Sequence, residues 1–214
     1  DRYGLRRAAL GIVRTVLAHG FKIYLPALLE AAVDTLPPAV VKDRAALLLQ
    51  VREFMMTRLR HHLTQEHPAE VVDAVLSLDT GLEDLPAALS RIEILAESHG
   101  QPEFEPIAVT FKRAANILTD PPTSVAVNPA LFEAPAEILL HDTIQSTAKA
   151  LSERIAARDF RGALDLLVDL RDPVDTFFDA VLVNAPDEAL RANRHAMLAQ
   201  IIGMLRLIAD VKRL

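Results

Sequence analysis

The sequence predicts an all-α fold, and three observations carry that prediction. Alanine and leucine dominate the 214 residues, whereas only 7 residues are glycine. This composition favours helix over sheet. Apolar residues recur at helical spacing almost throughout the chain, and no segment shows the strict alternation of a half-buried strand. Several prolines fall between the apolar stretches, where they end or begin helices.

Three helices are predicted in the first part of the chain. The first helix carries an apolar stripe made of Leu5, Ala9, Ile12 and Val16. Arg7 and Arg14 lie seven residues apart on its opposite face, with Arg6 at the flank. The next two helices are predicted over 21–36 and 43–65, separated by a pair of prolines.

The remaining helices are predicted over 68–78, 85–98, 105–118, 135–157, 160–172, 173–183 and 187–212. A proline-rich loop of roughly fifteen residues precedes residue 135, and such a long loop is often functional or poorly ordered. Pro173 is expected to separate two neighbouring helices. A turn at Thr80 and Gly81 favours two parts, with a helical region over 1–80 and a helical bundle over 81–214.

The charge distribution argues against a generic nucleic-acid-binding protein, because the net charge is −6. Residues 1–62 carry 10 Lys and Arg against 5 Asp and Glu, whereas residues 63–214 carry 13 against 24. Any RNA contact must therefore be local, or be assisted by other parts of a larger assembly. Cysteine is absent, which excludes disulfides and thiolate sites and fits a reducing cytoplasm. No apolar run is long enough to span a membrane.

Six short segments occur in order along the chain. They are residues 6–11 (RRAALG), 54–60 (FMMTRLR), 72–76 (VDAVL), 111–118 (FKRAANIL), 128–132 (NPALF) and 172–183 (DPVDTFFDAVLV). The last helix then opens with DEALR over 187–191. Together these segments resemble the C-terminal region of the β subunit of bacterial glycine–tRNA ligase, the heterotetrameric type. DEALR resembles the D-A-L-R signature of its anticodon-binding domain with one extra acid, and Asn128 stands where the family has Asp.

This resemblance implies a helical linker region over 1–80, followed by a DALR-type anticodon-binding helical bundle over 81–214. It implies a cytoplasmic, non-catalytic part of the ligase that binds the anticodon arm of glycine tRNA. The partner α subunit, in an α2β2 assembly, would activate glycine with ATP and Mg. No cofactor is expected in this chain. The resemblance also implies that the chain runs to the family's C-terminus.

The residues themselves provide no catalytic pattern. The chain has no Gly-rich phosphate loop, no H-E-x-x-H motif and no signature of a nucleophile with its base. His141 and Asp142 form an isolated pair within a helix and are expected to face solvent. His61 and His62 lack partners at metal-ligand spacing. The sequence therefore predicts neither a catalytic residue nor a metal site.

The strongest RNA-binding candidates lie on the helix over 105–118. Lys112 and Asn116 are four residues apart and share one side, flanked by Arg113. A cation can bind a phosphate, and an amide can bind the edge of a base. The alternative is a solvated face with a helix-capping asparagine.

Arg191 and Arg194 of the last helix are also candidates. Arg194 falls on the apolar stripe of that helix, and a cation in such a place is usually a partly buried structural arginine paired with an acid. Asp175 or Asp179 could be that acid. Phe177 and Phe178 are better read as core residues than as a stacking platform for bases.

The N-terminal candidates are Arg7, Arg58 and Arg60. Arg58 lies on the apolar side of its helix, which favours a buried ion pair. A basic surface could instead be built from the exposed arginines, namely Arg6, Arg7, Arg14 and Arg60. An ordinary solvated face explains the same residues equally well.

Two alternatives remain open. A helical protein–protein docking scaffold without RNA binding would use the acidic surface to meet a partner, but it would not share the six ordered segments. The anticodon domain of arginine–tRNA ligase has a similar D-A-L-R helix, but the F-F-D segment and the N-terminal half fit it poorly.

Overall fold

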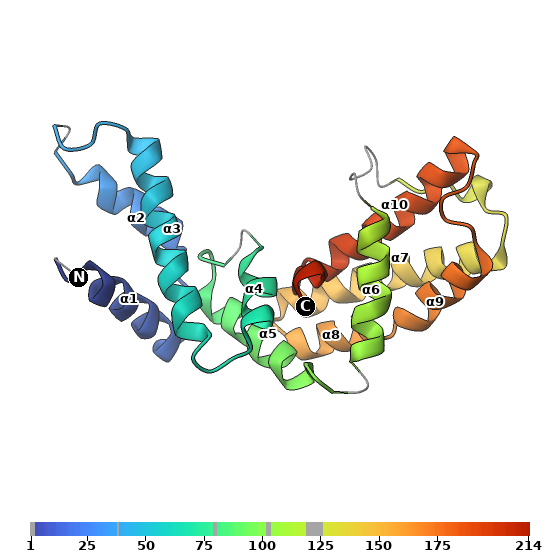
Figure 1. The fold of residues 1–214 in the computed structure, drawn as a ribbon, viewed down its shortest axis with the longest axis horizontal. Helices are drawn as coiled ribbons and strands as arrows, with labels where there is room; N and C mark the ends of the chain where they lie inside the picture. Colours follow the sequence, from blue (N-terminus) through green and yellow to red (C-terminus); the bar gives the residue numbers. More distant parts are fainter. Residues whose placement is uncertain (1–2, 38, 79–80, 102–103, 119–125) are drawn as a thin grey trace. The chain divides into compact units, whose positions relative to one another are not determined.

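The structure is a computed structural model that describes residues 3–37, 39–78, 81–101, 104–118 and 126–214. Within these ranges all regular structure is helical and no strand occurs, which confirms the all-α prediction (Figure 1). The chain divides into two compact units, an N-terminal unit of residues 1–97 and a C-terminal unit of residues 98–214. The sequence placed its boundary after residue 80. The assignment of linker and anticodon-binding domain to the two parts stays a prediction.

The N-terminal unit consists of five helices among its described residues. They are α1 (Leu5–His19), α2 (Leu25–Asp34), α3 (Arg44–Leu63), α4 (Ala69–Leu76) and α5 (Leu85–Ser98). Gly20 ends α1 in the left-handed conformation, with φ at 60°, where glycine meets no steric penalty. The Asp43 carboxylate begins α3 by accepting a hydrogen bond from the Ala46 backbone N–H. α1, α2 and α4 all pack against α3.

The buried face of α1 differs from the predicted stripe. Ala9, Val13 and Val16 are buried, whereas Leu5 is 59% exposed and Ile12 is 45% exposed. Both sets recur at helical spacing, and packing against α3 decides which of them is buried. The predicted stripe was therefore wrong at Leu5 and Ile12.

The C-terminal unit contains five helices and two short 3₁₀ turns in its described part. They are α6 (Glu105–Ile117), η1 (Pro129–Leu131), α7 (Pro135–Ala156), α8 (Phe160–Val168), α9 (Arg171–Ala180), α10 (Glu188–Leu205) and η2 (Val211–Arg213). α7 packs against α8, α9 and α10, while α6 packs against α9, α10 and η2. Phe177 is fully buried and Phe178 nearly so, which confirms that both are core residues.

Pro173 does not separate two helices as predicted. α8 ends at Val168, α9 begins at Arg171, and Pro173 lies within the first turn of α9. Proline is tolerated there because its missing N–H would have no intrahelical partner in the first turn. Part of the predicted long loop, including Asp120, lies outside the described residues; the described part, 126–134, contains η1. No helix in the described ranges is long and apolar enough to cross a membrane.

Candidate nucleic-acid interface

A surface groove in the C-terminal unit contains the three strongest candidates from the sequence. α6 contributes Lys112, Arg113 and Asn116 to it. The other lining residues are Val109, Ile117, Asn184 and His195. The groove has a volume of about 760 Å³. The structure thus brings the predicted α6 residues together with two side chains, Asn184 and His195, that the sequence analysis did not identify as groove residues.

The helical period of α6 explains why these residues line the groove. Ile107 and Phe111 are buried in the core, so the residues on the other side of the helix face outward. Arg113 is exposed, and its guanidinium lies 4.2 Å from the centroid of the Phe178 ring. This cation–π contact holds the charge near the groove.

Lys112 and Asn116 remain available to a ligand. Among the described residues, neither side chain has a hydrogen bond or ion pair with the protein. Leu118 occupies the C-cap position of α6, so Asn116 is not the capping residue that the alternative reading required. A cation and an amide are therefore presented together on one side of α6, with no partner from the described part of the chain.

Asn184 and His195 reach the groove as a hydrogen-bonded pair. The distance from His195 Nε2 to Asn184 Oδ1 is 2.8 Å. Burial lowers the pKa of His195, and the positive charge of Arg191 lowers it further. The imidazole is therefore neutral at pH 7.

Arg191 itself stabilises the segment before α10. Its guanidinium donates to the backbone carbonyl of Ala185 at 2.8 Å and lies 3.4 Å from that of Pro186. Arg191 is not among the groove residues, although its charge acts on His195.

The groove is locally basic within an acidic unit. Residues 98–214 carry 12 Lys and Arg against 16 Asp and Glu, a net charge of −4. The residues that line the groove include Lys112 and Arg113 and no acid. Clefts lined by one sign of charge concentrate ligands of the opposite sign, so this groove favours an anionic ligand.

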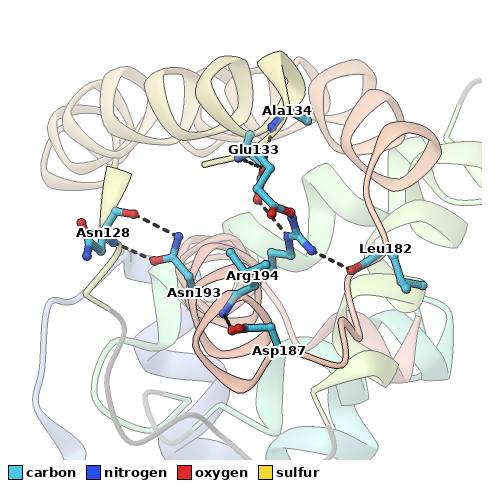
Figure 2. A network of polar contacts seen from close by, with 9 residues as sticks. Asn128, Glu133, Ala134, Leu182, Asp187, Asn193 and Arg194 are labelled. Carbon is cyan, nitrogen blue, oxygen red and sulfur yellow. Dashed lines mark hydrogen bonds and ion pairs between the residues drawn. The ribbon is translucent and has the colours of Figure 1, made fainter. Parts of the chain in front are cut away.

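Arg194 lies in the interior and not in the groove. It is 5% exposed, and its guanidinium contacts Glu133 at 2.8 Å and the Leu182 carbonyl at 3.1 Å (Figure 2). It also contacts Glu137 at 2.9 Å. The structural reading of Arg194 is confirmed. The predicted acids were wrong: Asp175 instead accepts a hydrogen bond from the Thr110 hydroxyl.

Glu137 is the buried partner in this network, with 0% of its surface exposed. Burial raises the pKa of its carboxyl, but hydrogen bonds from Arg194 and from the backbone N–H groups of Glu133 and Ala134 lower it, and the net shift is downward. Glu137 is therefore ionised at neutral pH. A buried carboxylate of this kind depends on its cationic partner.

Asn193 holds the chain segment before α7. Its amide accepts the Asn128 backbone N–H at 2.7 Å and donates to the Asn128 carbonyl at 3.1 Å (Figure 2). The Asn128 side chain accepts from the Ala130 backbone N–H and caps η1. Three consecutive residues of α10 thus bind two connecting segments. Residue 193 binds residue 128 in the segment before α7, whereas residues 194 and 195 bind residues 182 and 184 in the segment before α10.

The N-terminal candidates lie outside this groove. Arg60 forms two hydrogen bonds with the Asp73 carboxylate, at 2.5 and 2.7 Å. Arg58 lies 4.9 Å from the centroid of the Phe54 ring, and no described acid pairs with it, so the predicted ion pair was wrong. Arg7 is exposed on α1.

The structure corrects the prediction for His141. His141 is half-buried with its ring centroid 5.5 Å from that of Phe132, so the expectation that it faces solvent was wrong. Asp142, its neighbour, is exposed. Over the described residues, no three His, Cys, Asp or Glu side chains gather closely enough to hold a metal ion.

Sequence comparisons add the family context. Residues 1–77 match the family described as Glycyl-tRNA synthetase beta subunit. Over 214 residues, the whole chain is 39% identical to the glycine–tRNA ligase beta subunit of Geotalea uraniireducens (strain Rf4). The predicted resemblance to this subunit is confirmed.

Other glycine–tRNA ligase beta subunits are similarly related. That of Anaeromyxobacter dehalogenans (strain 2CP-C) is 38% identical over 217 residues, and that of Myxococcus xanthus (strain DK1622) is 35% identical over 222 residues. In each case the match covers all of this chain and 31% of the relative's length. The chain therefore spans less than a third of the length of the relatives that it matches.

Proposed function

We propose that the chain is a non-catalytic, tRNA-binding part of a glycine–tRNA ligase β subunit, and that its C-terminal unit binds the anticodon arm of glycine tRNA. The observation that carries this proposal is the groove, where Lys112, Arg113 and Asn116 lie beside Asn184 and His195 without an acidic residue. The relatives, which are named for glycine–tRNA ligase, supply the identity of the RNA.

The lining residues match the parts of a single-stranded nucleotide. Lys112 and Arg113 would bind phosphate oxygens, while the amides of Asn116 and Asn184 would bind the edge of a base. Val109 and Ile117 would contact the apolar face of the base. Sequence-specific RNA recognition usually targets such unpaired bases, as in the loop of an anticodon arm.

Catalysis is assigned to a partner. The groove contains no nucleophile paired with a base, and its residues suit binding better than bond breaking. In this proposal the α subunit of an α2β2 ligase uses ATP and Mg to glycylate the tRNA. The present chain binds the tRNA during that reaction, which takes place in the cytoplasm.

The salt dependence of RNA binding tests the role of the groove. Fluorescence anisotropy would follow labelled glycine tRNA binding to the 214-residue chain and to its Lys112→Ala variant. If Lys112 binds a phosphate, the slope of log affinity against log salt falls by about 0.7–0.9 in the variant. Lys149→Ala is the matched control, because Lys149 is exposed on α7 and does not line the groove. Equal slopes for both variants would reject the groove as the binding site.

Base replacement tests whether the anticodon is read. Glycine tRNA with its anticodon bases replaced should bind the chain more weakly than the unaltered tRNA, while the salt slope remains the same. Equal affinities for the two tRNAs would mean that the chain binds only the phosphates, and would reject recognition of the anticodon bases. No binding of either tRNA at low salt would reject the proposal for this chain and favour the protein-docking scaffold.

A further inference from the structure

Asn184 lies in the groove with only one half of its amide bound to the described residues. Its Oδ1 lies 2.8 Å from His195 Nε2. An amide oxygen can only accept a hydrogen bond, so His195 Nε2 must carry the proton and donate. The Asn184 NH₂ group has no acceptor among the described residues.

This pairing fixes the hydrogen-bonding character of the groove. With its oxygen occupied, Asn184 can offer a ligand only its two N–H donors. Lys112 and Arg113 likewise offer only donors, so the open acceptors among the lining side chains are the Asn116 amide oxygen and Nδ1 of the neutral His195 ring, fewer than the donors. The groove therefore suits groups that present acceptor atoms.

We propose that His195 is a positioning residue that makes Asn184 a donor, so that the groove selects acceptor-rich parts of a nucleotide. Such parts are phosphate oxygens, base carbonyl oxygens and ring nitrogens without hydrogen. This inference rests on the proposed RNA-binding function. It adds that the RNA must accept the hydrogen bonds that the groove donates. Without His195, the Asn184 amide can rotate and present its oxygen, which repels the same acceptors.

The neighbouring contacts explain why this position is stable. Asn184 lies in the segment before α10, and that segment is held on both sides of it. Arg194 binds the Leu182 carbonyl at 3.1 Å, and Arg191 binds the Ala185 carbonyl at 2.8 Å. The backbone at Asn184 therefore stays in place when the side chain of His195 is changed.

A double-mutant cycle tests the proposal with the 214-residue chain and glycine tRNA. Asn184→Ala and His195→Ala should each weaken binding, by about tenfold, as expected for one hydrogen bond. The double variant should lose no more than either single variant, because both changes remove the same contact. Losses that multiply in the double variant would overturn the proposal, since His195 would then contact the RNA itself.

Conservative variants separate positioning from a structural role. Glutamine can place an N–H donor near the position of Nε2, so His195→Gln should retain most of the affinity. Asparagine is one carbon shorter, so His195→Asn should bind as weakly as His195→Ala. Urea unfolding of each variant checks that the fold is intact. Equal affinities for the Gln and Asn variants would overturn the proposal.

The outcomes distinguish this inference from the proposed function. If Lys112→Ala weakens tRNA binding but Asn184→Ala does not, the groove binds RNA and only the role of His195 is rejected. If neither variant changes the affinity, the groove itself is rejected as the RNA site.

Discussion

Arg194 illustrates, at the scale of a residue, how a charge on an apolar helix face is accommodated. It lies between the buried Glu137 and the more exposed Glu133, and its third contact is a backbone carbonyl. The guanidinium provides several N–H donors in a fixed plane, which lets one side chain satisfy all three partners. The network therefore joins α7, α10 and the segment before α10.

Removing Arg194 should strongly destabilise the protein. Arg194→Met leaves the Glu137 carboxylate buried without its cation, which typically costs about 3–5 kcal/mol. Urea denaturation followed by circular dichroism would measure the free energy of unfolding. Arg206→Met, an exposed position at the end of the same helix, is the control and should cost less than about 1 kcal/mol.

A second substitution tests the reason for that loss. Glu137→Gln combined with Arg194→Met removes the unpaired charge, so the double variant should be more stable than Arg194→Met alone. If the double variant loses as much unfolding free energy as the two single variants together, the buried unpaired charge is not the cause of the loss in Arg194→Met.

At the scale of an element, α10 depends on the residue that begins it. Asp187 Oδ1 accepts the Leu190 backbone N–H at 2.9 Å, so the acid of the DEALR segment is a helix cap. The sequence predicted that the last helix opens at Asp187, and the structure places Asp187 at the N-cap, one residue before Glu188. Because α10 carries Asn193, Arg194 and His195, its start determines where those side chains lie.

Loss of this cap should have a moderate effect on stability. Asp187→Ala is expected to lower the free energy of unfolding by about 1 kcal/mol, because one N-terminal N–H loses its acceptor. Asp187→Ser retains an oxygen acceptor and should stay close to the parent protein. Thermal unfolding of the two variants checks this. Equal losses in both would mean that charge at the helix start, and not capping, is what stabilises α10.

The helices themselves were predictable because their signals are local. Spacing of apolar residues, prolines and capping residues placed α5 and most other helices close to their observed bounds. Local signals could not decide between Val13 and Ile12 on α1, since packing with α3 selects the buried face. Nor could they identify Glu137 as the partner of Arg194, because 57 residues separate the two and their contact depends on how α7 and α10 pack.

Only the part of the groove that lies on one helix could be predicted, because the signals in the sequence are local. Lys112, Arg113 and Asn116 belong to one helix, so periodicity alone groups them. Asn184 and His195 join them only through the packing of α6 against α10.

At the scale of the whole molecule, the chain consists of two compact units, and each has its own core. Leu59 and Ile92 are buried in the N-terminal unit, while Leu140 and Phe177 are buried in the C-terminal unit. Units with separate cores can in principle fold independently.

A fragment of residues 98–214 should therefore fold and bind RNA by itself. Its circular dichroism should be helical, its urea unfolding cooperative, and its affinity for glycine tRNA equal to that of the 214-residue chain. A folded fragment with lower affinity would assign part of the RNA contact to the N-terminal unit. A fragment without cooperative unfolding would mean that the two units depend on each other for stability.

The contact between Asn193 and Asn128 has an evolutionary consequence. Asn193 binds only the backbone of residue 128, through one N–H and one C=O. The side chain at position 128 is needed only to supply an oxygen for the Ala130 N–H, which aspartate can do as well as asparagine. Position 128 can therefore change between asparagine and aspartate without moving the segment. Position 193 has no such latitude, because only a side-chain amide of that length can bind both backbone groups.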